Sequence, residues 1–420
     1  MIELIKSEKE KAILVGIKTR DKSRKSVEEH LQELEMLAKT AGAETILKVI
    51  QERFSFDSAF CIGKGKAEEV AELAELNEIN LIIFDEDLTS TQVRNLEKLI
   101  NKKIIDRSGL ILDIFAAHAK TRQAKTQVEL AQLQYMLPRL TRAWTHLSKQ
   151  YGGIGTKGPG ETQIETDRRI IRTRISHLKE SLQKIEAQDA IKSSKRKNYL
   201  NVSIVGYTNA GKSTLMNLLT KSELLAEDKL FATLDSTTRS FELEKNKMII
   251  LSDTVGFIRK LPAHLIASFK STLNVVREAD YILHVVDISN EFYEEHIAVV
   301  QETLKELKCD SKPTKIVFNK VDSLSDSSQL NFLLNKFQNC IAISALKGMN
   351  ISAIYDSLLK VYEENFREET IELPIHETKK LSVIHQLADV LSTKYIEDKV
   401  SIHFRTDITT LNKIKRLING

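Results

Sequence analysis

The sequence predicts an α/β protein with several domains, because three kinds of local pattern follow one another along the chain. Short apolar runs alternate with helical patterns over roughly the first hundred residues. Two long amphipathic helical patterns come next, and a glycine-rich strand–loop–helix sequence follows them. The expected fold is an N-terminal α/β domain with an antiparallel helical hairpin, then a P-loop domain, then a small α+β domain at the C-terminus. In the P-loop domain we expect a mostly parallel sheet with helices on both faces.

The first domain, expected over residues 1–115, contains repeated βα units. Apolar runs indicate strands, and a 3.6-residue apolar period indicates helices. The predicted strands cover residues 12–17, 45–50, 81–85 and 103–106, and the predicted helices cover residues 26–42, 66–78 and 91–100. A helix between successive strands allows those strands to pair in parallel, so this domain should be a small, mostly parallel α/β layer.

Residues 116–192 are expected to form the helical hairpin. The first apolar seam has gaps that alternate between three and four residues, as in a heptad, and it consists of Leu130, Leu133, Leu137, Leu140, Trp144, Leu147 and Tyr151. Pro138 lies inside this seam and should kink or break the helix. The second seam consists of Ile164, Ile171, Ile175, Leu178, Leu182 and Ile185. Two helices with one apolar stripe each, joined by a short loop, should fold back on each other.

The loop between these helical patterns is rich in glycine, since five of the 15 glycines in the chain lie from Gly152 to Gly160. Part of it, Gly153-Ile-Gly155-Thr-Lys-Gly158, fits the G-x-G-x-x-G dinucleotide fingerprint. That fingerprint requires a strand before it, and here helical patterns flank it on both sides. We therefore interpret the loop as the tip of the hairpin, whose glycines permit close backbone approach to a partner. A flexible connecting turn is the alternative interpretation.

Charge is unevenly distributed along the chain. The net charge is only +4, but His118 to Leu200 contain 17 Lys/Arg against 7 Asp/Glu, which leaves the remainder with a balance of −6. A basic segment on an otherwise acidic chain indicates a polyanionic partner, with RNA the leading candidate. A solvated helical surface rich in lysine would give the same count.

Composition excludes several other classes of protein. The chain is 42% hydrophobic and 29% charged, as is usual for a globular protein. Acidic residues and lysines interrupt the apolar runs of the N-terminus, so we expect no signal peptide. No apolar stretch approaches the roughly 18 residues of a membrane span. The three cysteines are far apart and lack the spacing of metal ligands, so we expect incidental thiols in a reducing compartment.

A buried-type strand at residues 199–206 continues directly into G-x-x-x-x-G-K-S and a helical pattern, the context that a P-loop requires. Its glycines let successive backbone N–H groups surround the α- and β-phosphates of a nucleotide at the helix N-terminus. Lys212 is suited to neutralise β/γ-phosphate charge, and the Ser213 hydroxyl can ligate Mg²⁺. The predicted phosphate-binding residues are Gly206, Tyr207, Thr208, Asn209, Ala210, Gly211, Lys212 and Ser213.

Three further motifs follow in order, each at the end of an apolar run: Asp253, Thr254, Val255 and Gly256; then Asn319, Lys320, Val321 and Asp322; then Ser344, Ala345 and Leu346. Asp253 can hold magnesium, commonly through water, and the Gly256 N–H can reach the γ-phosphate. Asp322 can accept hydrogen bonds from guanine N1–H and N2–H₂, which adenine does not offer. Asn319 can brace the loop, and the last motif can bring backbone amides to guanine O6. The four motifs together predict a GTPase domain.

With these residues the chain resembles the HflX family of ribosome-associated GTPases. The resemblance covers most of the chain and rests on YGGIGTKGPGETQIETDRR, GYTNAGKS, LFATLDSTTR, DTVGF and NKVD. It implies a GTP hydrolase that requires Mg²⁺ and binds the large (50S) ribosomal subunit and its ribosomal RNA through the basic hairpin. Implied roles are ribosome splitting or rescue, protein synthesis, or ribosome biogenesis. Stimulation by ribosomes, a monomeric state and a cytoplasmic location, on ribosomes or at the membrane periphery, are further expectations.

The resemblance also implies a switch in FATLD, where Thr233 would close on Mg²⁺ and the γ-phosphate. The predicted catalytic residues are thus Lys212, Thr233 and Gly256. The other switch residues expected to contact nucleotide are Phe231, Ala232, Leu234 and Asp235. From the residues alone, Thr237 and Thr238 are alternatives to Thr233. The family usually has proline after LD, and Ser236 stands there in this chain, which leaves the switch backbone less constrained.

Two positions concern catalysis. Ras-like proteins place a glutamine after DxxG to orient the attacking water, and Phe257 stands there in this chain, so intrinsic hydrolysis should be slow. Asn209 occupies a P-loop position that related GTPases use to hold potassium, which makes K⁺ a candidate cofactor. A turn-stabilising asparagine is the alternative.

Two other functions remain open from the sequence: an ATP-using remodeller of ribosomal RNA, and an assembly factor that needs nucleotide occupancy but not turnover. Competition between ATP and GTP would separate the first from a GTPase, and Asp322 favours GTP. The GTPase domain is expected over residues 199–365 and the C-terminal domain over residues 366–420.

Overall fold

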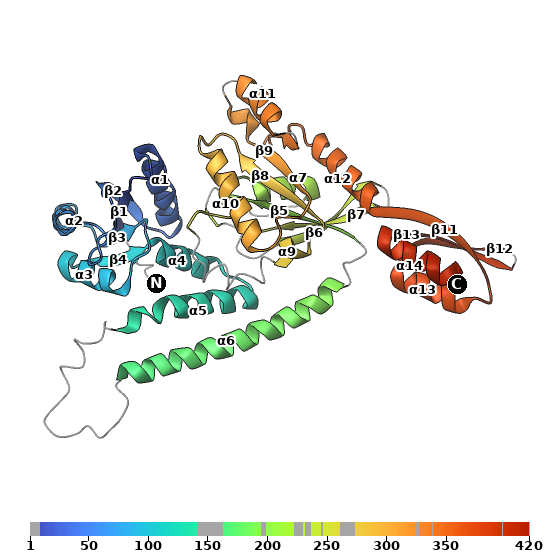
Figure 1. Cartoon of the computed structure of the whole chain (residues 1–420), viewed down its shortest axis with the longest axis horizontal. Coiled ribbons are helices and arrows are strands. Elements are labelled where there is room, and N and C mark those ends of the chain that lie inside the picture. The colour runs from blue at the N-terminus through green and yellow to red at the C-terminus, as the bar shows by residue number, and fades with distance from the viewer. Residues whose placement is uncertain are drawn as a thin grey trace, which may run out of the picture. The chain divides into compact units, whose positions relative to one another are not determined.

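The computed structural model describes residues 9–141, 163–194, 199–221, 230–231, 237–244, 247–260, 274–324, 327–337, 339–396 and 398–419. These residues form two compact units (Figure 1). The first contains the chain up to Ile185 with two later segments, and the second contains most of the rest. The division into four domains at residues 115, 192 and 365 stays a prediction.

The first unit has a four-stranded sheet in the order β2-β1-β3-β4, and all three strand pairs are parallel. Its strands are β1 (Lys11–Lys18), β2 (Glu44–Glu52), β3 (Leu81–Phe84) and β4 (Lys103–Asp106). Its helices are α1 (Arg24–Thr40), α2 (Lys64–Leu76), α3 (Ser90–Ile100) and α4 (Arg107–His118). The alternation of strands and helices expected from the sequence is therefore confirmed. β4 lies at the edge of the sheet as described, where β3 is its one partner strand.

The helices of this unit cover opposite faces of the sheet. Ile13, Val15 and Ile17 of β1 belong to a core cluster that also contains buried residues of α2 and α3. Gly16 of the same strand packs against Leu31 of α1, and successive strand residues point to opposite faces. Because α1 contacts α4, the pair α1 and α4 covers one face, and the pair α2 and α3 covers the other.

Two further helices, α5 (Arg122–Met136) and α6 (Gln163–Ser194), form the helical hairpin. Leu130 and Leu133 of the first seam pack with Ile175, Leu178 and Leu182 of the second. A bidentate Arg174–Glu129 pair, at 2.7 and 3.0 Å, joins the same two helices. α5 ends two residues before Pro138 and a short 3₁₀ turn η1 (Arg139–Thr141) follows, so the predicted break at this proline is confirmed. The glycine-rich tip, residues 152–160, lies outside the described residues, as do the last three residues of the first seam.

The second unit contains a six-stranded sheet in the order β10-β9-β8-β5-β7-β6, in which only the β6–β7 pair is antiparallel. Its strands are β5 (Leu200–Gly206), β6 (Thr237–Glu244), β7 (Lys247–Asp253), β8 (Tyr281–Asp287), β9 (Thr314–Asn319) and β10 (Cys340–Ala342). The described helices and turns beside it are α7 (Lys212–Thr220), α9 (Asn274–Glu278), α10 (Tyr293–Glu306), η2 (Val321–Ser323), α11 (Ser327–Lys336) and α12 (Ser352–Asn365). This is the mostly parallel sheet that the sequence predicts.

Helices lie on both faces of this sheet. Leu200, Val202 and Ile204 of β5 share a core with buried residues of α7 and α12. Val205, which points to the other face, belongs to a cluster with Val276 of α9 and with residues of α10. β5 is therefore buried on both faces, which explains why its run of apolar residues is almost continuous.

The C-terminal part of the second unit is a three-stranded antiparallel sheet with two helices packed on each other. Its elements are β11 (Phe366–Pro374), α13 (Thr378–Leu387), β12 (Asp389–Ile396), β13 (Lys399–Asp407) and α14 (Ile408–Asn419). Ile384, Ile402, Phe404 and Ile414 form the centre of its own small core. None of the described helices has the length and apolar character to span a membrane.

Candidate functional site

The loop between β5 and α7 has a backbone shape that its glycines make possible. Gly211, which caps α7, has a φ of 88°, a left-handed conformation that residues with a Cβ rarely adopt. A Cβ at this position would also collide with the Asn319 side chain, and one at Gly206 would collide with the carbonyl of Val285. Asn209 also has a left-handed φ, of 60°, which asparagine tolerates better than most residues. The loop therefore lies directly on β8 and on the end of β9.

Lys212 is buried at the N-terminus of α7, where its Nζ donates a hydrogen bond of 2.8 Å to the carbonyl of Tyr207. Burial lowers the pKa of the Lys212 ammonium to about 8, while Asp253 acts in the opposite direction. His284 of β8 is buried near the same cation, and desolvation together with Lys212 lowers its pKa to about 4. At neutral pH the site therefore holds a charged lysine beside a neutral histidine.

The Ser213 hydroxyl donates to Asp253 Oδ2 at 2.7 Å, which joins the P-loop to the end of β7. Asp253 is fully buried, and its other carboxylate oxygen, Oδ1, has no hydrogen-bond partner among the described residues. Burial raises the pKa of this carboxyl, and Lys212 and Ser213 oppose that shift. A buried carboxylate oxygen without a donor is costly unless a cation or a water satisfies it. A hydroxyl and a carboxylate are also the hard oxygen ligands that Mg²⁺ takes, so these residues fit the expected ion.

The DTVG segment is hydrogen-bonded to the P-loop. Thr208 N–H donates to the carbonyl of Phe257 at 2.8 Å, and Phe257 N–H donates to the carbonyl of Gly206 at 3.0 Å. A Cβ on Gly256 would lie 2.8 Å from Thr208 Cγ2 and 3.1 Å from Lys212 Nζ. The backbone of Gly256 therefore packs directly against Thr208 and the Lys212 ammonium, with no space for a side chain between them.

The Phe257 side chain is 2% exposed and packs in the core cluster of Val205, α9 and α10. Its ring is part of the core between the sheet and these helices. The position after DTVG thus supports packing in the described structure, and it supplies no polar group for a water molecule.

Asn319 connects two loops that are far apart in sequence. Its Nδ2 donates to the carbonyl of Ala210 in the P-loop, and its Oδ1 accepts from the N–H of Ala345, both at 2.9 Å. The following residue, Lys320, has a left-handed φ of 65° and makes an ion pair of 2.6 Å with Asp287 at the end of β8. These contacts fix the NKVD turn against both neighbouring loops.

Asp322 is held in its charged form and has one carboxylate oxygen available. A hydrogen bond from Ser344 is the largest cause that lowers the pKa of this carboxyl, and Lys347 and Lys320 contribute. Asp322 Oδ1 is buried, and no group in the described part of the chain hydrogen-bonds to it. Ser344 N–H is used within its own loop, donating to the carbonyl of Met349.

The chain matches three family models. They are described as "GTP-binding GTPase N-terminal" over residues 28–116, "GTP-binding GTPase Middle Region" over residues 118–196 and "50S ribosome-binding GTPase" over residues 201–320. A GTPase HflX of Flavobacterium psychrophilum is 52% identical over 314 residues, which are 75% of this chain and 76% of that protein. The GTPase HflX of Escherichia coli K12 is 40% identical over 410 residues, 96% of this chain and 95% of that protein.

The chain belongs to the HflX family of GTPases.

It is thus a GTP hydrolase, as the four sequence motifs predict. Among solved structures, a GTP-binding protein of Sulfolobus solfataricus in complex with GDP is 25% identical, covers 84% of this chain and 99% of its own, and has a TM-score of 0.44. A second GDP complex, of a protein called SsGBP, is 26% identical over the same share of this chain, with a TM-score of 0.48.

The described structure brings together many of the residues predicted for this HflX GTPase. Three hydrogen bonds join the four predicted motifs into one group in the second unit. Ser213 of the P-loop bonds to Asp253 of DTVG, and Asn319 of NKVD bonds both to the P-loop and to Ala345 in the last motif. The predicted switch residues are not part of this hydrogen-bonded group. Phe231 belongs to the first unit, where its ring meets that of Phe115 edge to face with centroids 4.7 Å apart. Its expected contact with nucleotide stays a prediction.

The other switch residues, Ala232, Thr233, Leu234 and Asp235, lie outside the described part of the chain. Both alternatives to Thr233 are described. Thr238 has its hydroxyl in a 3.0 Å hydrogen bond with Ser252, whereas Thr237 lies opposite Asp253 in the β6–β7 register. Thr237 is therefore the alternative whose backbone comes nearest the Ser213–Asp253 pair.

Sequence reasoning did not identify Asp287 or the Tyr207–His296 pair. Asp287 ends β8, at the same sheet edge as the other motifs, and that position was the signal that could have found it. The Tyr207 ring stacks on His296 of α10 with centroids 3.8 Å apart, and its hydroxyl accepts from the Arg259 N–H at 3.0 Å. No spacing in the sequence relates these residues.

Proposed function

We propose that this HflX-family GTPase binds GTP at the edge formed by β5, β7, β8 and β9, hydrolyses it with Mg²⁺, and does so on the large ribosomal subunit. The observation that carries this proposal is the Ser213–Asp253 hydrogen bond of 2.7 Å, with the second oxygen of Asp253 buried and unpartnered. This arrangement supplies two hard oxygen groups beside Lys212 at a helix N-terminus, the Ser213 hydroxyl to bind a metal directly and the Asp253 carboxylate to hold it through water, as a nucleoside triphosphate with its metal requires.

Each loop has a defined role in this proposal. The backbone N–H groups from Gly206 to Ser213 surround the α- and β-phosphates, and Lys212 transfers its hydrogen bond from the Tyr207 carbonyl to a phosphate oxygen. Gly256 presents its N–H to the γ-phosphate, a position that leaves no room for a side chain. Asn319 holds the P-loop and the Ser344 loop together, so that both sides of the base pocket keep their spacing.

Base selection rests on Asp322. Its unpartnered, charged oxygen is suited to accept from guanine N1–H and N2–H₂, and adenine would leave it buried without a donor. Lys320, fixed by Asp287, is suited to cover one face of the base. Leu346 N–H is the amide we assign to guanine O6, because the N–H groups of Ser344 and Ala345 already donate within the protein.

Ser213 and Thr233 would ligate the magnesium ion, with Asp253 reaching it through water. A bound magnesium ion would neutralise negative charge that develops on the phosphates during hydrolysis. Asn209, in its left-handed conformation, is the residue we expect to contact a potassium ion. A faster turnover in potassium than in sodium chloride, lost in Asn209→Ala, would support that assignment.

Intrinsic hydrolysis should be slow, because Phe257 is in the core and the described P-loop and DTVG segments supply no polar side chain after Gly256 to orient water. A bound partner must then complete the site. We propose that the partner is the 50S subunit, contacted through ribosomal RNA by the basic hairpin of α5 and α6. Splitting or rescue of ribosomes, protein synthesis and ribosome biogenesis are the processes in which such a switch could act.

The test is to replace the tip, residues 152–160, with a Ser/Asn loop of equal length. The packing of Leu130 and Leu133 on α6 should keep the hairpin folded. Intrinsic GTP hydrolysis should stay unchanged, because the described nucleotide-site residues follow Val205. Stimulation by purified 50S subunits should be lost, and binding to them should weaken steeply with salt in the unmodified protein. Equal stimulation of both proteins would show that the loop is only a connecting turn.

Two further measurements separate the other two functions from a GTPase. An ATP-using RNA remodeller would bind ATP as tightly as GTP, which the unpartnered oxygen of Asp322 argues against. An assembly factor that requires occupancy alone would act equally with GTP and with a non-hydrolysable analogue. Competition between ATP and GTP tests the first alternative, and sedimentation with ribosomes in the presence of GTP or the analogue tests the second.

A further inference from the structure

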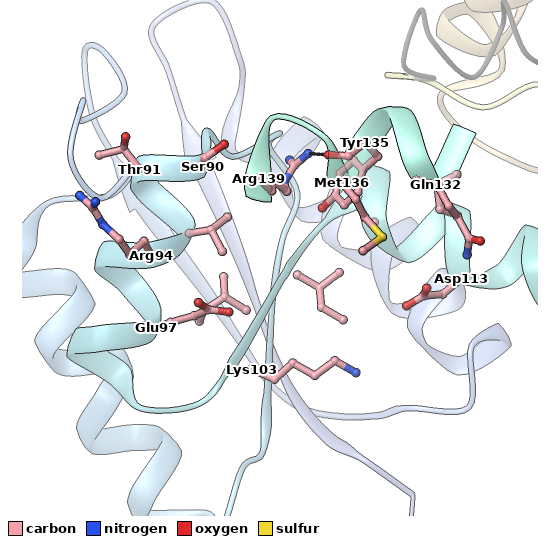
Figure 2. A pocket seen from close by; sticks show the side chains of 15 residues that line it. Ser90, Thr91, Arg94, Glu97, Lys103, Asp113, Gln132, Tyr135, Met136 and Arg139 are labelled. Carbon is pink, nitrogen blue, oxygen red and sulfur yellow. Dashed lines mark hydrogen bonds between the residues drawn. The ribbon is translucent and has the colours of Figure 1, made fainter. Parts of the chain in front are cut away.

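The first unit contains a cavity of about 870 Å³ that the nucleotide site does not use (Figure 2). This volume lies within the range of roughly 300–1,000 Å³ that is typical of ligand sites. The cavity follows the free edge of β4, so the strand residues Lys103, Ile104 and Ile105 form its floor. α3 lines one side, and α4 with the end of α5 lines the other.

The floor has hydrogen-bonding capacity that the sheet does not use. Among the described strands β4 pairs only with β3, and in a parallel pair alternate residues direct their N–H and C=O groups away from the partner strand. Those groups face the cavity along the edge of β4. An exposed edge of this kind is a template for one more strand.

Two carboxylates point into the cavity from opposite sides: Glu97 from α3 and Asp113 from α4 (Figure 2). Within the described residues neither carboxylate takes part in a hydrogen bond or an ion pair. Both are accessible to solvent, and desolvation by the surrounding protein nevertheless raises the pKa of each carboxyl. Lys103 opposes the shift at Asp113, although its own ion pair, at 3.5 Å, is with Glu10.

The basic residues of the lining are mostly engaged elsewhere. Arg139 pairs with Asp106 at 2.7 Å and donates to the carbonyls of Leu88 and Tyr135. Arg94 lies at the far end of the cavity beside the start of α3 (Figure 2). Lys103 lies on the strand edge between the two acids, and its ion pair is with Glu10, so Glu97 and Asp113 remain the charged groups of the lining that a cationic ligand can pair with.

The positions of the two carboxylates match the geometry of an added strand. Ile104 points into the core under α2 and α3, and the next residue, Ile105, points to the face of α1 and α4. A strand paired with β4 would follow the same alternation. Two consecutive side chains of that strand would therefore point one toward Glu97 and the other toward Asp113.

We propose that this cavity binds an extended basic peptide segment of another protein, which pairs its backbone with the free edge of β4 and places two consecutive Lys or Arg side chains against Glu97 and Asp113. The carboxylates disfavour RNA, because they would repel its phosphates. A small polyamine would satisfy the two charges but would leave the backbone groups of β4 unused.

The experiment measures fluorescence anisotropy with the full-length protein at low salt and a labelled peptide, acetyl-Thr-Val-Arg-Arg-Val-Thr-amide. Glu97→Gln and Asp113→Asn should each weaken binding about threefold, and the double variant about tenfold, which is the scale of exposed charge pairs. The double variant Glu72→Gln/Glu75→Gln, two exposed acids on α2, removes the same charge outside the cavity and should bind normally.

Two further ligands test the strand pairing. The same peptide with alternate backbone nitrogens methylated should bind at least tenfold more weakly. A peptide in which both Arg residues are replaced by Gln should lose about as much affinity as the Glu97/Asp113 double variant does. Thermal melting and basal GTP hydrolysis should be unchanged in every variant, since the substitutions are solvent-accessible and belong to the first unit. Equal binding of the methylated peptide, equal binding by the Glu97/Asp113 double variant, or tighter binding of spermidine than of the peptide would each overturn the proposal.

Discussion

Asp322→Asn is the substitution that most directly tests how this GTPase recognises its base. The change keeps the shape of the side chain and replaces the buried, unpartnered Oδ1 or its neighbour with an amide. In the unmodified protein, Ser344, Lys347 and Lys320 hold the pKa of Asp322 below its usual range, so the acceptor is charged at neutral pH.

The expected loss follows from the number of hydrogen bonds. A carboxylate can accept from both N1–H and N2–H₂ of guanine, and hydrogen bonds to charged groups contribute about 1.5–3 kcal/mol each. Loss of both would weaken GTP binding by at least about 3 kcal/mol, or roughly 100-fold. Xanthine carries an oxygen where guanine carries the N2 amine, so the amide of Asn can donate to it. The variant should therefore bind XTP better than GTP.

The assay is displacement of fluorescent GDP by GTP, ATP and XTP at saturating Mg²⁺. Asp310→Asn, an exposed carboxylate in the same unit, provides the matched control and should leave all three affinities unchanged. The reasoning is refuted if Asp322→Asn binds GTP normally, or if the unmodified protein binds ATP and GTP equally.

Five other substitutions test the rest of the site. Ser213→Ala and Thr233→Ala should each lower Mg²⁺-dependent turnover by roughly 100-fold at unchanged melting temperature. If Thr233→Ala turns over normally and Thr237→Ala does not, the switch threonine is Thr237. Because burial lowers the pKa of Lys212 to about 8, the free protein loses that charge as pH rises through 8. GTP affinity should be full below pH 8 and fall by up to about tenfold per unit above it, and Lys212→Met should abolish that dependence. Phe257→Gln should destabilise the protein by about 3 kcal/mol in thermal melts without faster single-turnover hydrolysis, since its side chain faces the core.

The sequence by itself determined the motifs that are contiguous and the elements that carry them. G-x-x-x-x-G-K-S, DTVG and NKVD are read by spacing alone, because a strand, a tight turn and a helix N-terminus follow one another within a few residues. The βα alternation of the first unit and the two apolar seams of the hairpin were readable for the same reason, since their periods are local. The break before Pro138 needed only the missing N–H of proline.

Contacts between distant residues were decided only by tertiary structure. Asn319 hydrogen-bonds the carbonyl of Ala210, 109 residues earlier, and Asp287 pairs with Lys320, because β5, β8 and β9 are neighbours in the sheet with their carboxyl ends at one edge. The direction of Phe257, into the core rather than toward the phosphates, depends on its bridge to Tyr207. Glu97 and Asp113 likewise face each other only because α3 and α4 cover opposite faces of a sheet that ends at β4. Strand order and face are set by packing of the whole chain, and no local spacing encodes them.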